Sequence, residues 1–195
     1  MSRDPFRVLA VPGSLRSGSL NRRLLETVAE RAPEDVEIVL YDGLGGLPHF
    51  DADLDTRPGP EAVEDLRARM FAADGILIAT PEYNSSIPGV LKNALDWASR
   101  PYGTAALVGR PAAVVGVSPS AFGAVWAAAE VRKVLTASGA RVVDAELGVK
   151  KADSLVDEHG RFDDATVDAV LGLVAGLREV AAEAAAEAEA DAALA

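Results

Sequence analysis

One stretch constrains the fold more than any other. The apolar residues 75–80 are followed at once by the turn-forming residues 81–89. The uninterrupted run Gly-Ile-Leu-Ile-Ala-Thr is typical of a strand that is buried on both faces of a parallel sheet. Pro81, Asn84 and Pro88 end that strand, and Pro88 suits the start of a helix directly after it. The segment therefore predicts a strand, a polar loop and a helix, and open parallel sheets bind ligands at loops of this kind.

The same arrangement occurs near the N-terminus. The apolar residues 6–11 precede Gly-Ser-Leu-Arg-Ser-Gly-Ser-Leu-Asn at 13–21, where an amphipathic segment begins. Glycines let a backbone approach an anion at a helix N-terminus, and Arg16 adds a fork-shaped donor. The loop lacks both the Gly-Lys-Ser/Thr ending of a Walker loop and the G-x-G-x-x-G dinucleotide fingerprint. It predicts a phosphate-binding loop, although these residues alone fit FMN and a sugar phosphate equally, and a simple turn with Ser17 or Ser19 as helix cap is the plainer interpretation.

Strands and helices are predicted to alternate along the rest of the chain. Strands are predicted at 6–11, 35–41, 75–80, 111–117 and 141–145, and helices near 20–32, 63–71, 89–98, 122–138 and after 162. Alternation of this kind implies right-handed crossovers and a parallel sheet. The prediction is an α/β three-layer sandwich with five parallel strands in the flavodoxin-like order 2-1-3-4-5.

Two motifs together resemble one known family. Residues 13–21 and the long motif Pro-Glu-Tyr-Asn-Ser-Ser-Ile-Pro-Gly-Val-Leu-Lys-Asn-Ala-Leu-Asp-Trp-Ala-Ser-Arg-Pro at 81–101 resemble the NAD(P)H-dependent FMN reductases, which include chromate- and quinone-reducing flavoproteins. The resemblance extends over roughly residues 5–145. It implies an oxidoreductase that binds FMN, takes hydride from NADPH or NADH, and reduces flavin, quinone, azo or metal-oxyanion acceptors such as chromate.

The resemblance also implies a set of cofactor-binding residues on three loops. These residues are Ser14, Arg16, Ser17, Ser19, Asn21, Pro81, Glu82, Tyr83, Asn84, Ser85, Ser118, Phe122 and Gly123. The first loop holds the phosphate and ribityl end, and the second follows the isoalloxazine ring, largely through backbone groups. The third completes the site, although Ala124 stands where relatives often carry a second glycine. No catalytic side chain is predicted, because the flavin supplies the chemistry. No metal site is predicted, because the acidic residues 51–55 are followed by Thr56 and Ala62 where a calcium loop has glycine and glutamate.

Composition narrows the remaining possibilities. The 195 residues suit one domain, and the absence of cysteine excludes disulfides, thiolate catalysis and iron–sulfur clusters. The net charge of −11 repels nucleic acids and anionic membranes, so the expected partners are small molecules or proteins. With no apolar signal-peptide core at the N-terminus, we expect a cytoplasmic protein.

The chain is expected to divide into a flavodoxin-like domain at 1–180 and an Ala/Glu-rich tail at 181–195. The tail is interpreted as a frayed helical extension, with a partner helix as the alternative. The spacing of Leu91, Leu95 and Ala98 makes residues 91–98 a packing helix, whereas Trp97 near Arg100 suggests an interface anchor, and both interpretations stay open. The resemblance implies a homodimer or a dimer of dimers. Two other functions stay open at this point: an electron-carrying flavodoxin and a flavin-free interaction domain.

Overall fold

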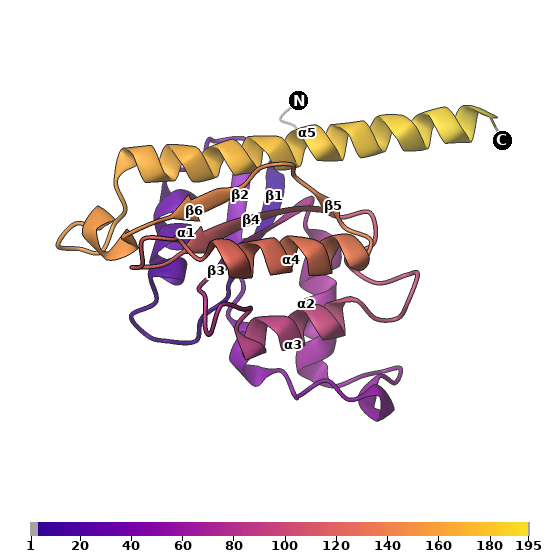
Figure 1. Ribbon diagram of the computed structural model, residues 1–195. Helices are drawn as coiled ribbons and strands as arrows, with labels where there is room; N and C mark the ends of the chain where they lie inside the picture. Colours follow the sequence, from indigo (N-terminus) through magenta and orange to yellow (C-terminus); the bar gives the residue numbers. More distant parts are fainter. Residues whose placement is uncertain (1–3, 195) are drawn as a thin grey trace.

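A parallel sheet with helices on both faces forms the centre of the protein, and the computed structural model describes residues 4–194 (Figure 1). The strands are β1 (Phe6–Pro12), β2 (Val36–Leu40), β3 (Gly75–Thr80), β4 (Pro111–Val117), β5 (Arg141–Val142) and β6 (Leu147–Val149). The α-helices are α1 (Leu20–Glu30), α2 (Glu61–Ala72), α3 (Gly89–Ala98), α4 (Val125–Ala137) and α5 (Asp164–Leu194). Short 3-10 helices occur at Gly43–Gly46, Ala52–Leu54 and Ala152–Leu155.

The sheet has the predicted order β2-β1-β3-β4-β5, and every pairing is parallel. Alternate residues of the central strands face opposite layers. In β1, Val8 and Ala10 join a core with α1 and α5, whereas Leu9 and Val11 join a core with α2, α3 and α4. The fold therefore has three layers, and the strands' carboxyl ends all meet at one edge.

The fifth strand differs from its prediction. Only Arg141–Val142 pairs as β5, and β6, which was not predicted, pairs farther along β4. Between these strands Arg132 of α4 donates from Nη1 to the carbonyl oxygens of Val143 (2.7 Å) and Ala145. The Val143 N–H still donates to Ala112 O of β4 over 2.8 Å, whereas the carbonyl oxygens on this stretch bond to Arg132, and the chain detours before it returns to β4.

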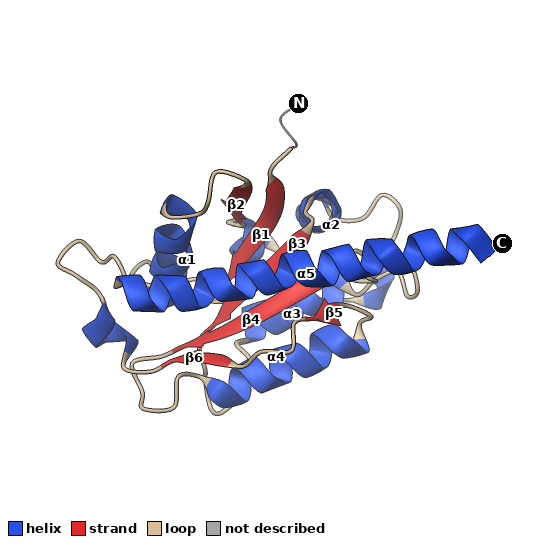
Figure 2. Ribbon diagram, turned by 90° about the horizontal axis from the view of Figure 1, so that it is seen from above, coloured by secondary structure: helices blue, strands red, loops and turns tan. Residues whose placement is uncertain are grey.

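Helix α5 crosses the sheet and continues past it, so the helical part of the tail reaches Leu194 (Figure 2). Its buried residues are Val167, Val170, Leu173, Val174 and Leu177. Leu171, between these positions, is only half-buried. After Val180 only small side chains are even half-buried, so the last turns add little to the core.

Two further features bear on possible sites. No helix within residues 4–194 combines the length and apolar character needed to cross a bilayer.

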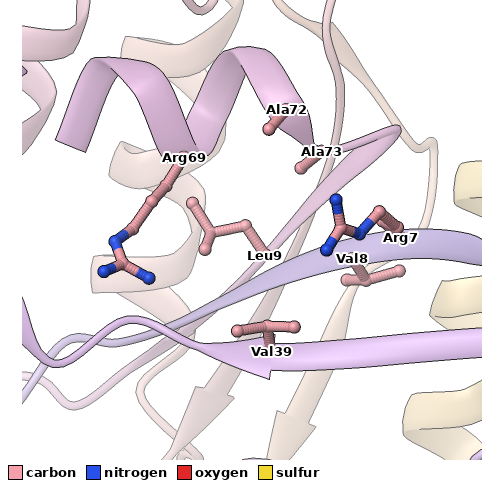
Figure 3. Close-up of a pocket in the computed structure, with 7 residues that line it drawn as sticks. All are labelled: Arg7, Val8, Leu9, Val39, Arg69, Ala72 and Ala73. Carbon is pink, nitrogen blue, oxygen red and sulfur yellow. The ribbon is translucent and has the colours of Figure 1, made fainter. Parts of the chain in front are cut away.

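A hollow of about 100 Å³ lies between β1, β2 and the end of α2 (Figure 3). It is lined by Arg7, Val8, Leu9, Val39, Arg69, Ala72 and Ala73. It lies toward the amino ends of the strands, away from the three loops, and it is below the size of usual ligand pockets.

Candidate functional site

The three predicted loops meet at the carboxyl edge of the sheet. The Gly13 N–H donates to Ala79 O over 2.8 Å, and a Cβ on Gly13 would lie 3.4 Å from Pro81 Cδ. The first loop therefore touches the second. Asn21 Nδ2 lies 3.5 Å from Val117 O, which joins the start of α1 to the strand that leads into the third loop. The sheet thus brings together loops that are distant in the sequence.

The first loop ends in a capped helix. Ser19 is the N-cap of α1, and its hydroxyl accepts from the N–H of Arg22 over 3.3 Å. A tight turn precedes it, because the Ser19 N–H donates to Arg16 O over 3.0 Å. The Arg16 side chain is exposed, and among residues 4–194 its guanidinium makes one hydrogen bond, from Nη2 to Gly18 O over 3.2 Å. The predicted cap and phosphate loop are therefore parts of one structure.

The same loop leaves donors available to a ligand. Within residues 4–194, the backbone N–H groups of Leu15, Ser17 and Gly18 donate to no protein acceptor. A Cβ on Gly18 would meet no atom within 4 Å, so the space beside it is open. Unpaired N–H groups beside a helix N-terminus and an arginine are the groups that bind a phosphate. The loop therefore fits the phosphate of FMN.

Two of the predicted residues lie beneath this loop. Ser14 is 9% exposed, and its hydroxyl accepts from the Arg16 N–H at 3.4 Å. Asn21 is 4% exposed, and its Oδ1 has no protein partner among the described residues. An unpaired buried amide oxygen is uncommon, and a hydroxyl donor from a ribityl chain would satisfy it after a small shift of the side chain.

The second loop is a tight reversal. Tyr83 and Ser86 exchange two backbone hydrogen bonds of 3.2 and 3.1 Å. Between them Asn84 and Ser85 have φ values of 53° and 59°. Two successive positive φ values are typical of a type I′ turn, a conformation that asparagine tolerates well. The turn leaves Tyr83, Asn84 and Ser85 exposed at the edge of the sheet.

Glu82 has a function that sequence reasoning missed. Its Oε2 accepts from the N–H groups of Trp126 (3.1 Å) and Ala127 (3.2 Å) in the first turn of α4. The residue before that helix, Ala124, has φ 58° and no side chain that can cap it. The carboxylate therefore caps α4 from another loop, where the helix dipole stabilises its charge. A separation of 44 residues leaves no local sequence signal for this contact.

Glu130 makes a second connection between α4 and the second loop. Its carboxylate accepts from the Ser86 hydroxyl at 2.6 Å and from the Ile87 N–H at 3.3 Å. These two hydrogen bonds hold the pKa of the Glu130 carboxyl below its ordinary value. Two carboxylates thus fix the position of the second loop relative to α4.

The third loop packs closely on the sheet. A Cβ on Gly116 would lie 2.2 Å from Gly123 O, and one on Gly123 would lie 2.8 Å from the carbonyl carbon of Gly148. Gly123 also has φ +63°, which favours glycine. The Ser118 hydroxyl accepts from the Ser120 N–H over 3.1 Å and shapes the start of the loop. Phe122, next to this close contact, is 58% exposed.

Of the two interpretations of Trp97, the structure supports the packing helix and contradicts the interface anchor. Trp97 is fully buried, and its Nε1 donates to Pro48 O over 2.8 Å. Phe50 packs edge-on against it, with ring centroids 4.9 Å apart. Trp97 therefore holds the loop after β2 against α3 and is not available as an interface anchor.

Comparisons with known proteins agree with this geometry. A sequence model of the NADPH-dependent FMN reductase family matches residues 6–154. The chain is 40% identical over 156 residues to the 2-hydroxy-1,4-benzoquinone reductase of Burkholderia sp., covering 80% of this chain and 84% of that protein. It is also 40% identical over 159 residues to an NAD(P)H-dependent FMN reductase of Pseudomonas aeruginosa, covering 81% and 85% of the two chains.

A solved structure of a flavoenzyme is also similar to this chain. The flavoenzyme NAD(P)H:(acceptor) oxidoreductase FerB from Paracoccus denitrificans superposes with a TM-score of 0.79 at 36% identity, covering 89% of this chain and 96% of that one. The predicted fold, the FMN cofactor and the dependence on NAD(P)H are thereby confirmed. The family match spans most of the chain, and the chain therefore belongs to the NADPH-dependent FMN reductase family.

Proposed function

We propose that this enzyme reduces quinones, with NADPH or NADH as the electron donor and FMN held by the three loops. The observation that carries the proposal is the first loop, whose unpaired N–H groups and exposed Arg16 lie beside the second and third loops. The names of two relatives, a hydroxybenzoquinone reductase and a quinone reductase from Pseudomonas putida, favour quinones over azo dyes and chromate. Reduction of a quinone takes up the hydride equivalent and one proton, which gives NAD(P)⁺ and a hydroquinone.

The chain's own residues position and neutralise the cofactor. Bound FMN supplies the capacity to accept hydride and to pass electrons on. Arg16 and the open N–H groups balance the phosphate charge, which matters in a protein of net charge −11. Glu82 and Glu130 hold the second loop in a fixed shape, so that its backbone groups meet the flavin ring without reorganisation. The carboxylate of Glu82 is occupied by α4, and we assign it no acid–base function.

Initial-rate kinetics of the FMN-loaded protein test the proposal. Donor and acceptor both need the exposed face of the flavin, so we expect NADPH oxidation with naphthoquinone to give parallel double-reciprocal lines. Intersecting lines would show that both substrates bind together. If the flavin-loaded protein oxidises neither NADPH nor NADH but exchanges single electrons with a protein partner, the flavodoxin alternative replaces ours.

Assembly belongs to the same proposal. We infer from the family resemblance that the active form is a homodimer or a dimer of dimers, in which the flavins lie near the subunit boundary. Light scattering of the FMN-loaded protein measures the subunit number, and a monomer with full activity would remove this part of the proposal. The cytoplasmic location stays a prediction.

A further inference from the structure

A fourth loop lies at the same edge of the sheet as the three flavin loops. Strand β6 runs parallel to the last residues of β4, with Val149 opposite Val117 (Figure 2). Lys150 and Lys151, here called the fourth loop, follow β6 directly. They therefore lie at the carboxyl edge, where open parallel sheets bind their ligands. Because β6 was not predicted, the sequence alone gave these lysines no position at this edge.

Backbone hydrogen bonds join the fourth loop to the third. The Lys151 N–H donates to Ser120 O over 3.0 Å, and the next N–H, of Ala152, donates to Ser118 O over 3.1 Å. In the opposite direction, the Ser118 N–H donates to Val149 O over 3.1 Å. These bonds fix the backbone of the fourth loop beside the third loop, which completes the predicted flavin site.

Both lysines of the fourth loop have ammonium groups that a ligand can reach. Each residue is exposed, and within residues 4–194 neither ammonium has a carboxylate within ion-pair distance. Lys150 lines the same groove as Phe122 of the third loop. Glu146 lines that groove too, and the exposed Asp153 follows in the chain, so the net local field is weak. Direct contact is therefore what the two lysines offer, and an ammonium group is a usual partner of phosphate.

The backbone of Lys151 has an uncommon conformation. Its φ of 47° lies in the left-handed region, which favours glycine. A lysine at this position is therefore disfavoured by its backbone, and it places a charge at the ligand-binding edge. Residues held in such conformations are concentrated at binding sites.

The donor nucleotide needs a second phosphate-binding point. In the first loop, Arg16 and the open N–H groups are assigned to the phosphate of FMN, and Arg22 beside them is paired with Asp42 and Glu26. NADH carries a pyrophosphate and NADPH a further 2′-phosphate, and the net charge of −11 repels both. A ribose separates the nicotinamide from the pyrophosphate, so the phosphates can meet the rim of the site while the ring reaches the flavin.

We propose that Lys150 and Lys151 bind the phosphate groups of the nicotinamide nucleotide donor. The proposal rests on the proposed function, because it concerns the electron donor of that reaction. It assigns no contact to the quinone, which carries no phosphate, so donor and acceptor still use the single flavin face in turn. Because the lysines are exposed, affinity for the donor should fall as the ionic strength rises.

Replacing the lysines in the FMN-loaded protein is the first test. Lys150→Gln and Lys151→Gln should each raise the KM for NADPH about threefold, and the double variant about tenfold, as expected for exposed ion pairs. The kcat, the KM for naphthoquinone and the FMN content should not change, because only binding of the donor is lost. Lys133→Gln is the matched control, at an exposed lysine of α4 that also has no carboxylate partner within residues 4–194.

Two further measurements check the sign and the equilibrium. Glu146→Gln removes a negative charge from the groove that Lys150 lines, so it should lower the KM for NADPH about twofold. Calorimetric titration of the FMN-loaded protein with NADP⁺ gives a dissociation constant without turnover. That constant should rise in the double variant by the same factor as the KM, and it should rise with added salt.

The two donors distinguish the phosphates. A loss confined to NADPH assigns the lysines to the 2′-phosphate, and an equal loss for NADPH and NADH assigns them to the pyrophosphate; both results support the proposal. It is wrong if the double variant changes neither the KM for either donor nor the NADP⁺ dissociation constant, if Lys133→Gln has the effect of Lys151→Gln, or if the double variant loses FMN. A wild type that oxidises neither donor contradicts the proposed function instead, and the NADP⁺ titration then decides this proposal alone.

Discussion

Arg16 is the residue whose replacement tests the cofactor site most directly. Its guanidinium is exposed and donates one hydrogen bond within the described part of the chain, so a ligand phosphate meets little competition. A hydrogen bond to a charged group contributes about 1.5–3 kcal/mol, so Arg16→Ala should weaken FMN binding roughly ten- to a hundredfold. Fluorescence titration of the apoprotein measures the dissociation constant. Arg7→Ala, at the other end of β1, is the control, and equal constants for Arg16→Ala and the wild type would refute the phosphate assignment.

Gly123 combines a positive φ with a backbone contact that a methyl group would occupy. A left-handed L-residue costs about 1–2 kcal/mol, and the clash with Gly148 adds to it. We expect Gly123→Ala to lower the free energy of unfolding by about 2 kcal/mol or more and to reduce the FMN content. Gly172→Ala, on the exposed side of α5, should instead stabilise the protein by up to about 1 kcal/mol. Urea denaturation compares the two variants, and equal stabilities would contradict this account.

Individual residues also show which features of the site could be predicted from the sequence. The glycines and serines of 13–21 and the cap at Ser19 were predictable, because their signals are local. The capping of α4 by Glu82 and the hydrogen bond from Trp97 to Pro48 were not predictable, because both depend on which loops the sheet brings together. Whether each predicted residue contacts the flavin stays a prediction that the variants above address.

At the scale of elements, α4 and the second loop depend on each other. Glu82→Ala removes the cap of α4, and a lost cap costs about 0.5–2 kcal/mol. We expect the variant to unfold more easily and to bind FMN less tightly, because the loop loses a fixed point. Glu82→Gln keeps an acceptor oxygen, so it should lose less stability and less FMN affinity than Glu82→Ala. Glu179→Ala, at an exposed position on α5, is the control. If Glu82→Ala and Glu179→Ala have the same free energy of unfolding, the cap does not stabilise the protein.

The contact of Glu130 with the same loop predicts a pH dependence. A carboxyl whose pKa is lowered on folding contributes stability that is present above its unfolded pKa and is lost as the pH falls through the folded value. The ordinary pKa is 4.5, so the contribution is complete at neutral pH and fades below that value. Glu130→Gln should therefore melt at a lower temperature than the wild type at neutral pH, and the difference should shrink on acidification. A constant difference across the series would show that ionisation of Glu130 is not involved.

The elements themselves were largely predictable. The apolar runs of β1, β3 and β4 and the turn residues after them predicted buried strands, and the alternation of strands with helices predicted the order of the sheet. The split of the last strand was not predictable. Residues 141–145 have the composition of a strand, but the guanidinium of Arg132 competes for the carbonyl oxygens of Val143 and Ala145.

For the whole molecule, the sheet and its two helical layers form the site, and the end of α5 extends beyond both (Figure 2). Its 31 residues span about 46 Å at 1.5 Å per residue. The part after Val180 holds to the sheet mainly through half-buried Ala181 and Ala184 and through a contact of 2.6 Å between Arg141 and Glu187. None of these contacts involves a residue of the three loops, so the site should form without them.

We therefore expect that a chain ending at Val180 keeps its FMN content and its rate of NADPH oxidation. Small alanine side chains bury little area, and at about 25 cal/mol per Å² they add little stability; weakly held termini also tolerate truncation. A chain ending at Gly172 is the control, since it lacks the buried Leu173, Val174 and Leu177 and should not fold. FMN per subunit, NADPH oxidation and mass in solution are measured for each chain. If the chain ending at Val180 loses flavin and becomes monomeric, the end of α5 is an assembly element, and the partner-helix alternative replaces the interpretation as a weakly held extension.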